Sequence, residues 1–215
     1  MRGLLEKDFR LIAQRKQTLL MYAAIALMMA MTMDSTYIIG YTVSLCVLLA
    51  VGTVSYDEFD NGFLFLMTLP VDRKTYVDEK YLFCILLDLA GWCVATLIYC
   101  GIALAQGRMA EAVAELPTLA SMMIPLTLGI SVMLPIQLKY GAGKSHLALA
   151  ILFGSAVLVV VGVRRLILSG AASSLGKRLS SLSPEAWVLA LSAVSLLVLF
   201  GSYLWSRHIM EEKEF

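Results

Sequence analysis

Residues 56–81 read Tyr-Asp-Glu-Phe-Asp-Asn-Gly-Phe-Leu-Phe-Leu-Met-Thr-Leu-Pro-Val-Asp-Arg-Lys-Thr-Tyr-Val-Asp-Glu-Lys-Tyr, and the organisation of the chain depends on this stretch. It holds nine charged residues, although only 15% of the 215-residue chain is charged, and it lies between two long apolar runs. A polar, helix-capable segment between membrane spans is where a membrane protein can contact a soluble partner. We interpret the segment as a mechanical input whose movement the spans convert into a change of path through the bilayer.

The composition is that of an integral membrane protein. Apolar residues make up 60% of the chain and the mean hydropathy is +0.81, whereas soluble proteins use roughly 45–50% apolar residues. The net charge of +1 provides no basic field for nucleic acid. The cysteines lie in apolar runs without metal-site spacing, and we interpret them as small buried side chains: Cys46, Cys84, Cys93 and Cys100.

Six apolar runs recur along the chain: Thr18–Met33, Ile38–Ser55, Leu82–Ala105, Pro117–Ile136, Leu147–Val163 and Trp187–Ser206. A membrane-spanning helix needs about 20 such residues, and only helices satisfy the backbone of a single apolar run in lipid. The sequence therefore predicts an all-α, polytopic membrane protein with six transmembrane helices in one domain, residues 1–215.

The lysines and arginines predict the orientation of these spans. Twelve of them fall in the N-terminal arm, residues 56–81, residues 137–146 and the C-terminal tail, against five in the loops on the other side. By the positive-inside rule, both termini and residues 56–81 are cytoplasmic, in a multi-pass protein of the cell membrane.

The N-terminal arm, Met1–Gln17, has an amphipathic pattern. Leu5, Phe9 and Ile12 recur at helical spacing among basic residues, which predicts a helix in the plane of the cytoplasmic headgroups. The alternative is the basic region of a signal peptide, which the absence of a convincing Ala-x-Ala cleavage site disfavours.

Turn residues divide residues 56–81 into two helical pieces. Gly62 is placed to break the first piece, and Pro70 is placed to end it because proline lacks an amide donor and restrains the residue before it. Asp72 then stands where it can cap a second piece, Arg73–Tyr81, that runs into the third span. A solvated linker with ordinary caps is the alternative, but the apolar side chains of the segment need a cover.

A family resemblance rests on two stretches. They are Leu4-Leu5-x-Lys7-Asp8-Phe9, and the run from Asp57-Glu58 through Gly62 to Leu69-Pro70-Val71-Asp72-Arg73-Lys74-x-Tyr76-Val77-x-x-Lys80-Tyr81. The chain resembles the permease subunits of ABC-2-type ATP-binding-cassette transporters, and especially the small bacterial group that includes the phenol-soluble modulin exporter permeases. Members of that group usually carry serine or threonine where this chain has Asp72.

The resemblance implies an in-plane elbow helix at residues 1–17, a cytoplasmic coupling helix between spans two and three, and a short outer helical pair at residues 164–186. It implies a non-catalytic permease whose ATP and Mg²⁺ are bound by a separate ATPase, with amphipathic peptides as exported cargo. We expect a pair of permeases, with itself or a sister chain, because six spans are too few to enclose a large route. The expected ATPase-coupling residues are Asp57, Glu58, Gly62, Leu69, Pro70, Arg73 and Lys80.

Residues 141–145, Gly-Ala-Gly-Lys-Ser, end like a phosphate-binding loop. The full motif needs a glycine where Leu138 stands and a nucleotide-binding domain around it, and neither is present in the sequence. We interpret Gly141, Gly143 and Lys144 as a second cytoplasmic contact for the ATPase, with an ordinary basic turn as the alternative.

Four residues are candidates for the translocation path: Asp88, Met28, Met29 and Pro125. Asp88 lies roughly 12 Å deeper than Lys80 along a helix, where a carboxylate is costly unless it faces a cavity or partner. Pro125 is placed to kink the fourth span, and the methionines suit a wall for varied cargo. A hydrated or hydrogen-bonded Asp88, an ordinary bend and lipid-facing methionines are the alternatives.

Two other classes of function remain open at this stage. One is an ion- or proton-coupled carrier that uses Asp88, and the other is a membrane scaffold or immunity protein. An enzyme is disfavoured because the only histidines, His146 and His208, stand beside predicted span ends and build no known hydrolase motif.

Overall fold

The computed structural model describes residues 1–32, 35–58, 62–68, 72–141 and 184–212, together with six single positions between 150 and 165. Within the five continuous ranges the ordered elements are helices, which confirms the all-α prediction. In chain order they are α1 (Arg2–Gln14), α2 (Lys16–Thr32), α3 (Ser35–Glu58), α4 (Gly62–Thr68), α5 (Arg73–Ala105), α6 (Met109–Ser121), α7 (Met123–Tyr140) and α10 (Pro184–Glu212).

In the described part of the chain, four helical stretches are long and apolar enough to cross a membrane: Ile39–Asp57, Arg73–Ala105, Met109–Tyr140 and Ala186–Glu212. Lys16–Met29, at the first predicted span, is apolar but shorter. The fifth predicted span and the outer pair at residues 164–186 fall largely outside the described residues. The count of six spans therefore stays a prediction.

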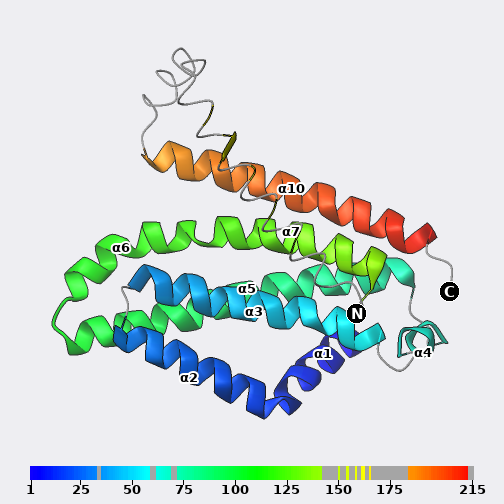
Figure 1. Cartoon of the computed structure of the whole chain (residues 1–215), viewed down its shortest axis with the longest axis horizontal. Coiled ribbons are helices and arrows are strands. Elements are labelled where there is room, and N and C mark those ends of the chain that lie inside the picture. The colour runs from blue at the N-terminus through cyan, green and yellow to red at the C-terminus, as the bar shows by residue number, and fades with distance from the viewer. Residues whose placement is uncertain are drawn as a thin grey trace.

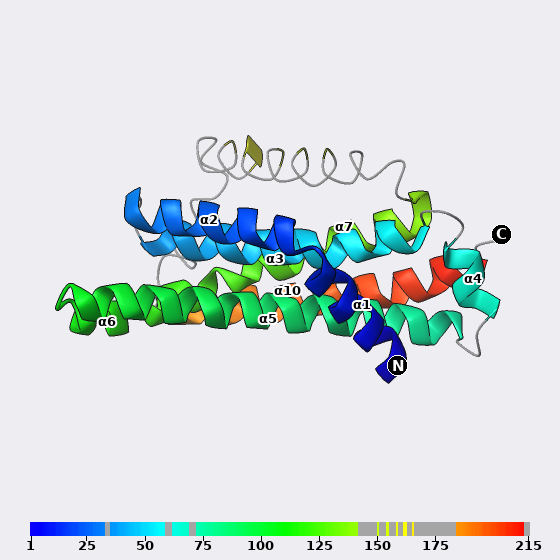
Figure 2. The ribbon, with the colours of Figure 1, turned by 90° about the horizontal axis from the view of Figure 1, so that it is seen from below.

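The helices form a layered bundle (Figure 1) in which α3 and α5 run side by side through the centre, α2 packs on α3, and α7 lies between this pair and α10. Helix α1 crosses the bundle at a steep angle and packs on α3 and α5 (Figure 2). Helices α1 and α4 and the C-terminal end of α10 all lie toward one end of the bundle (Figures 1 and 2).

A glycine allows α3 and α5 to approach closely. A Cβ atom at Gly91 would lie 2.8 Å from the Cys46 Sγ and 3.6 Å from the Val43 Cα, so no larger residue fits without a shift. Small residues at helix contacts let backbones come together in membranes, where packing replaces the hydrophobic drive. This contact holds the two central helices in register.

The fourth predicted span is interrupted one turn before Pro125. Helix α6 ends at Ser121 and α7 begins at Met123, and the Met122 amide donates a 3.2 Å hydrogen bond to the Leu119 carbonyl. Pro125 has no amide to donate to the carbonyl four residues earlier, at Ser121, and its ring crowds that position. The helix therefore breaks in the turn before the proline, where a kink was expected at Pro125 itself.

Candidate functional site

The predicted second piece of the organising segment, Arg73–Tyr81, is a continuous part of α5, which runs on to Ala105 as expected for the third span. Asp72 occupies the N-cap with extended backbone dihedrals of φ −73° and ψ 146°, but its carboxylate accepts no capping hydrogen bond. The helix start is therefore held by contacts with other helices.

Helix α4 is anchored on α5 by its inward face. Phe63 and Leu66 are buried, and the Phe63 ring meets the Tyr76 ring edge-on with centroids 5.3 Å apart. Phe65 points the other way and is 67% exposed. A Cβ atom at Gly62 would lie 2.9 Å from the Asp57 carbonyl oxygen, so the glycine lets α4 start directly against the end of α3.

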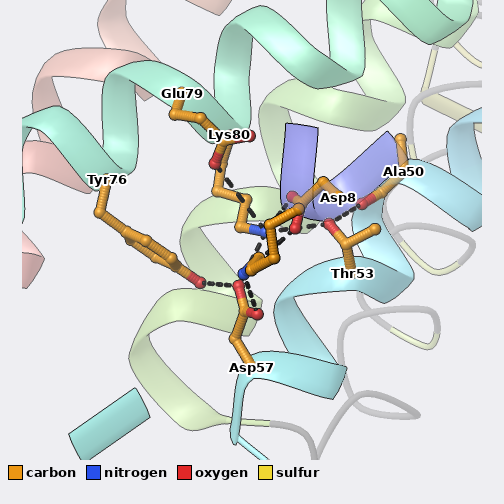
Figure 3. Close-up of polar contacts among 8 residues, drawn as sticks. Asp8, Ala50, Thr53, Asp57, Tyr76, Glu79 and Lys80 are labelled. Atoms are coloured by element: carbon orange, nitrogen blue, oxygen red, sulfur yellow. Dashed lines mark hydrogen bonds and ion pairs between the residues drawn. The ribbon is translucent and has the colours of Figure 1, made fainter. Parts of the chain in front are cut away.

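A buried cluster of charges lies where α1, α3 and α5 meet (Figure 3). The Lys80 ammonium, on α5, is fully buried and pairs with Asp8 of α1 and, at 2.8 Å, with Asp57 of α3. It also donates a 3.1 Å hydrogen bond to the Thr53 hydroxyl. Desolvating an ammonium costs several kcal/mol unless its donors are paired in this way.

The remaining partners complete the network around Asp57. Lys7 forms ion pairs with Asp57 and, at 3.1 Å, with Asp8. The Tyr76 hydroxyl donates to the Asp57 carboxylate at 3.0 Å. Helix α4 rests on the ring of the same Tyr76, so the cluster and the α4 anchor share a residue.

The opposite face of α5 is tied to α10. The Arg73 guanidinium donates to the carbonyls of Met210 and Glu211, at 3.2 and 3.1 Å, which satisfies acceptors that the end of α10 leaves open. The Tyr203 hydroxyl donates to Asp78 at 2.7 Å. Two ion pairs add to this contact: Lys74 with Glu211 at 2.7 Å and Arg207 with Asp78 at 3.6 Å.

Further along α5, a chain of hydroxyls crosses from α5 to α10 and α7. Ser202 donates to the Ser131 carbonyl at 2.5 Å, and that carbonyl is free because Pro135, four residues later, has no amide. The Tyr81 hydroxyl lies 2.6 Å from Ser202 and must donate to it, since the Ser202 proton is already used. Ser206, 2.8 Å away, then donates to Tyr81.

A comparison with protein families matches the chain from α1 through α10. A family model described as ABC-2 family transporter protein matches residues 3–211. The chain belongs to this family. Comparisons with curated proteins and with solved structures each found no match. As an ABC-2 family chain with helices that can cross a membrane, it is a multi-pass membrane protein, and the family implies an ABC ATPase partner.

Two of the residues that the sequence analysis assigned to ATPase contact are buried in this ABC-2 family protein. Asp57 and Lys80 lie inside the charge cluster, and the Arg73 guanidinium is engaged with α10. Glu58 ends α3, with its side chain outside the described residues. Leu69, Pro70, Gly143 and Lys144 also lie outside them.

Sequence reasoning missed Asp8 and the burial of Lys80. It assigned Leu5, Phe9 and Ile12 to the apolar pattern of a helix in the headgroup plane, whereas the structure buries Leu4, Asp8 and Ile12 and leaves Phe9 half exposed. The signal was present, because Asp8 stands four residues from both Leu4 and Ile12 and so shares their face. The burial of Asp8 was not predicted, because aspartate is rarely buried unless it is paired.

Of the residues predicted for a second cytoplasmic contact and for the translocation path, those that the structure describes belong to different helices. Gly141 terminates α7 with φ +76°, a conformation that favours glycine, and its amide donates to the Gln137 carbonyl at 2.9 Å. Asp88 is 1% exposed on α5, and Met28 and Pro125 are exposed on α2 and α7 while Met29 is half-buried. In the described residues, no group of His, Cys, Asp and Glu is arranged to hold a metal ion.

Proposed function

We propose that this chain is the membrane subunit of an ABC exporter, driven by a separate ATPase subunit that docks on residues 56–81. The observation that carries the proposal is α4, a short helix between two candidate spans with an exposed apolar side chain, in a chain that an ABC-2 family model matches over residues 3–211. The chain itself binds no nucleotide, and ATP and Mg²⁺ belong to the ATPase.

Phe65 is the side chain that the ATPase contacts first in this proposal. It is two-thirds exposed, while its neighbours Phe63 and Leu66 fasten α4 to the body of the protein. An exposed aromatic ring on a firmly held helix is the kind of residue that anchors an interface. Pressure on Phe65 passes through Phe63 to Tyr76, whose hydroxyl holds Asp57.

The rigid spans carry this movement across the bilayer as a change between two conformations. Both termini and α4 are cytoplasmic in this proposal, which their shared end of the bundle supports. Two permease chains together enclose the route, either two copies or a copy and a sister chain. Amphipathic peptides are the proposed cargo, on the basis of the family resemblance.

Co-purification in detergent with the ATPase encoded beside this chain tests the docking proposal. The decisive variant is Phe65→Ser, and the matched control is Leu104→Ser, because both side chains are 67% exposed and Leu104 lies at the far end of α5. We expect the wild type and Leu104→Ser to retain the ATPase and Phe65→Ser to lose it. Docking on α4 is wrong if Phe65→Ser retains the ATPase equally well.

A carrier driven by ions is the second candidate function, and one observation favours it. Asp88 is buried in a candidate span, and its Oδ1 has no hydrogen-bond partner in the described part of the chain. Transport that continues without ATP hydrolysis but stops in Asp88→Asn would support the carrier. Transport that stops with an inactive ATPase and continues in Asp88→Asn would exclude it.

A further inference from the structure

Glu79 is the one member of the charge cluster for which no hydrogen bond is found among the described residues. It is fully buried on α5, and neither of its carboxylate oxygens has a hydrogen-bond partner there. The nearest ammonium, that of Lys80, lies 4.0 Å from the Glu79 Oε2. In this conformation the Lys80 donors are directed to Asp8, Asp57 and Thr53.

Among the described residues, the cluster has more carboxylates than cations. Its three carboxylates, Asp8, Asp57 and Glu79, share the ammonium groups of Lys7 and Lys80. A buried carboxylate without a full partner lowers the stability of the state that contains it, because its lost hydration is not replaced. Glu79 is therefore less favourable in this conformation than in one that brings a hydrogen-bond donor to its carboxylate.

Asp57 and Glu79 are attached to different parts of the structure. Asp57 stands at the end of α3, and the start of α4 at Gly62 packs on its carbonyl oxygen. Glu79 belongs to α5 and moves with Lys80, its neighbour in sequence. A displacement of α4 that carries the end of α3 with it therefore changes the distance from Asp57 to Lys80 and leaves Glu79 beside Lys80.

We propose that Glu79 is the acceptor that takes the place of Asp57 at the Lys80 ammonium when movement of α4 draws Asp57 away. Lys80 then keeps its pair with Asp8 and regains a second carboxylate, because the Glu79 Oε2 lies 4.0 Å from the ammonium and a small side-chain rotation brings them together. Glu79 is in this sense a positioning residue for the transport cycle. The inference rests on the proposed function, because it requires that α4 moves.

Thermal unfolding of the purified protein in detergent tests this exchange without any ATPase. Glu79→Gln keeps the shape of the side chain and removes its charge. In the wild-type background we expect Glu79→Gln to raise the Tm by about 2–4 °C, because it removes a buried carboxylate that has no hydrogen-bond partner among the described residues. In an Asp57→Ala background, where Lys80 keeps Asp8 but has lost one of its two carboxylate partners, we expect the same substitution to lower the Tm.

The change of sign between the two backgrounds is the result that a merely structural Glu79 does not produce. A Glu79→Gln effect of the same sign in both backgrounds overturns the proposal. If Asp57→Ala does not fold, Asp57→Asn replaces it, and we expect a smaller reversal because the amide oxygen still accepts one hydrogen bond.

Asp78→Asn is the matched control in both backgrounds. Asp78 precedes Glu79 on the same helix but faces α10, where it pairs with Tyr203 and Arg207. Its substitution should lower the Tm to the same degree with and without Asp57. The unfolding measurements need no ATPase, so they stay interpretable even if Phe65→Ser shows that docking on α4 is wrong.

Discussion

The Lys80 ammonium lies 2.8 Å from the Asp57 carboxylate, so that an ion pair closes the base of the segment that carries α4. Asp57 comes from the end of α3, and Lys80 comes from the second turn of α5. Asp8 of α1 binds the same ammonium. Three helices are therefore joined through one buried cation at the point where the proposed input enters the membrane domain.

Removing this cation should destabilise the protein strongly. We expect Lys80→Met to lower the free energy of unfolding by about 3–5 kcal/mol, because it leaves Asp8 and Asp57 with too few partners in a buried site. Lys74→Met is the control, since Lys74 pairs with Glu211 on an exposed surface, and its effect should stay below about 1 kcal/mol. Thermal unfolding of both variants in the same detergent checks this, and equal effects would contradict the central role of Lys80.

The serine on α10 that binds the free Ser131 carbonyl should matter more than other serines of that helix. We expect Ser202→Ala to cost about 1–3 kcal/mol, because a buried carbonyl and the Tyr81 hydroxyl both lose a partner. Ser192→Ala is the control, since among the described residues the Ser192 hydroxyl donates to the Leu189 carbonyl within its own exposed turn. The midpoints of thermal unfolding of the two variants provide the test. Similar losses would show that the hydrogen bond from Ser202 to the Ser131 carbonyl does not stabilise the protein.

The contact between α3 and α5 predicts opposite effects for two glycines of α5. Gly91→Ala should cost about 1–3 kcal/mol, because the new Cβ meets the Cys46 side chain at 2.8 Å. Gly101→Ala has nothing within 4 Å and should be neutral or gain up to about 1 kcal/mol through helix propensity. Unfolding midpoints again provide the test, and a stabilising Gly91→Ala would mean that the helices pack less closely than described.

The tether between Arg73 and the end of α10 should be visible in hydrogen exchange. Arg73→Gln weakens the donors that hold the Met210 and Glu211 carbonyls, so we expect faster amide exchange over the last turn of α10. Arg10→Gln is the control, because in the described part of the chain Arg10 pairs with the exposed Glu6 one turn away. Unchanged exchange in Arg73→Gln would leave Arg73 available for the ATPase contact that the sequence suggested.

Much of the fold could be predicted from particular residues. The apolar run that ends at Ala105 and the polar start at Arg73 both appear in α5 as expected. Gly62 is the first residue of α4, so a helix begins where the sequence predicted a break, and the fourth predicted span is interrupted one turn before Pro125. These features follow from local chemistry, since hydropathy, missing amides and absent Cβ atoms act within a few residues.

The site was predicted less completely. Asp57, Gly62, Arg73 and Lys80 were predicted as part of a surface for the ATPase, and in the structure all four make contacts inside the chain. From sequence alone, a charged residue near the end of a span is predicted to be exposed unless its partner is known. One partner of Lys80, Asp8, is 72 residues away, and no local sequence pattern predicts such a pairing.

The sequence by itself determined that this chain is helical and built for a membrane, because long apolar runs in lipid have no other way to satisfy their backbone groups. Only the tertiary structure decided which charges are buried together. The crossing of α1 over α3 and α5 brings Asp8 to Lys80, and burial is tolerated there because each charge replaces the water that the other has lost.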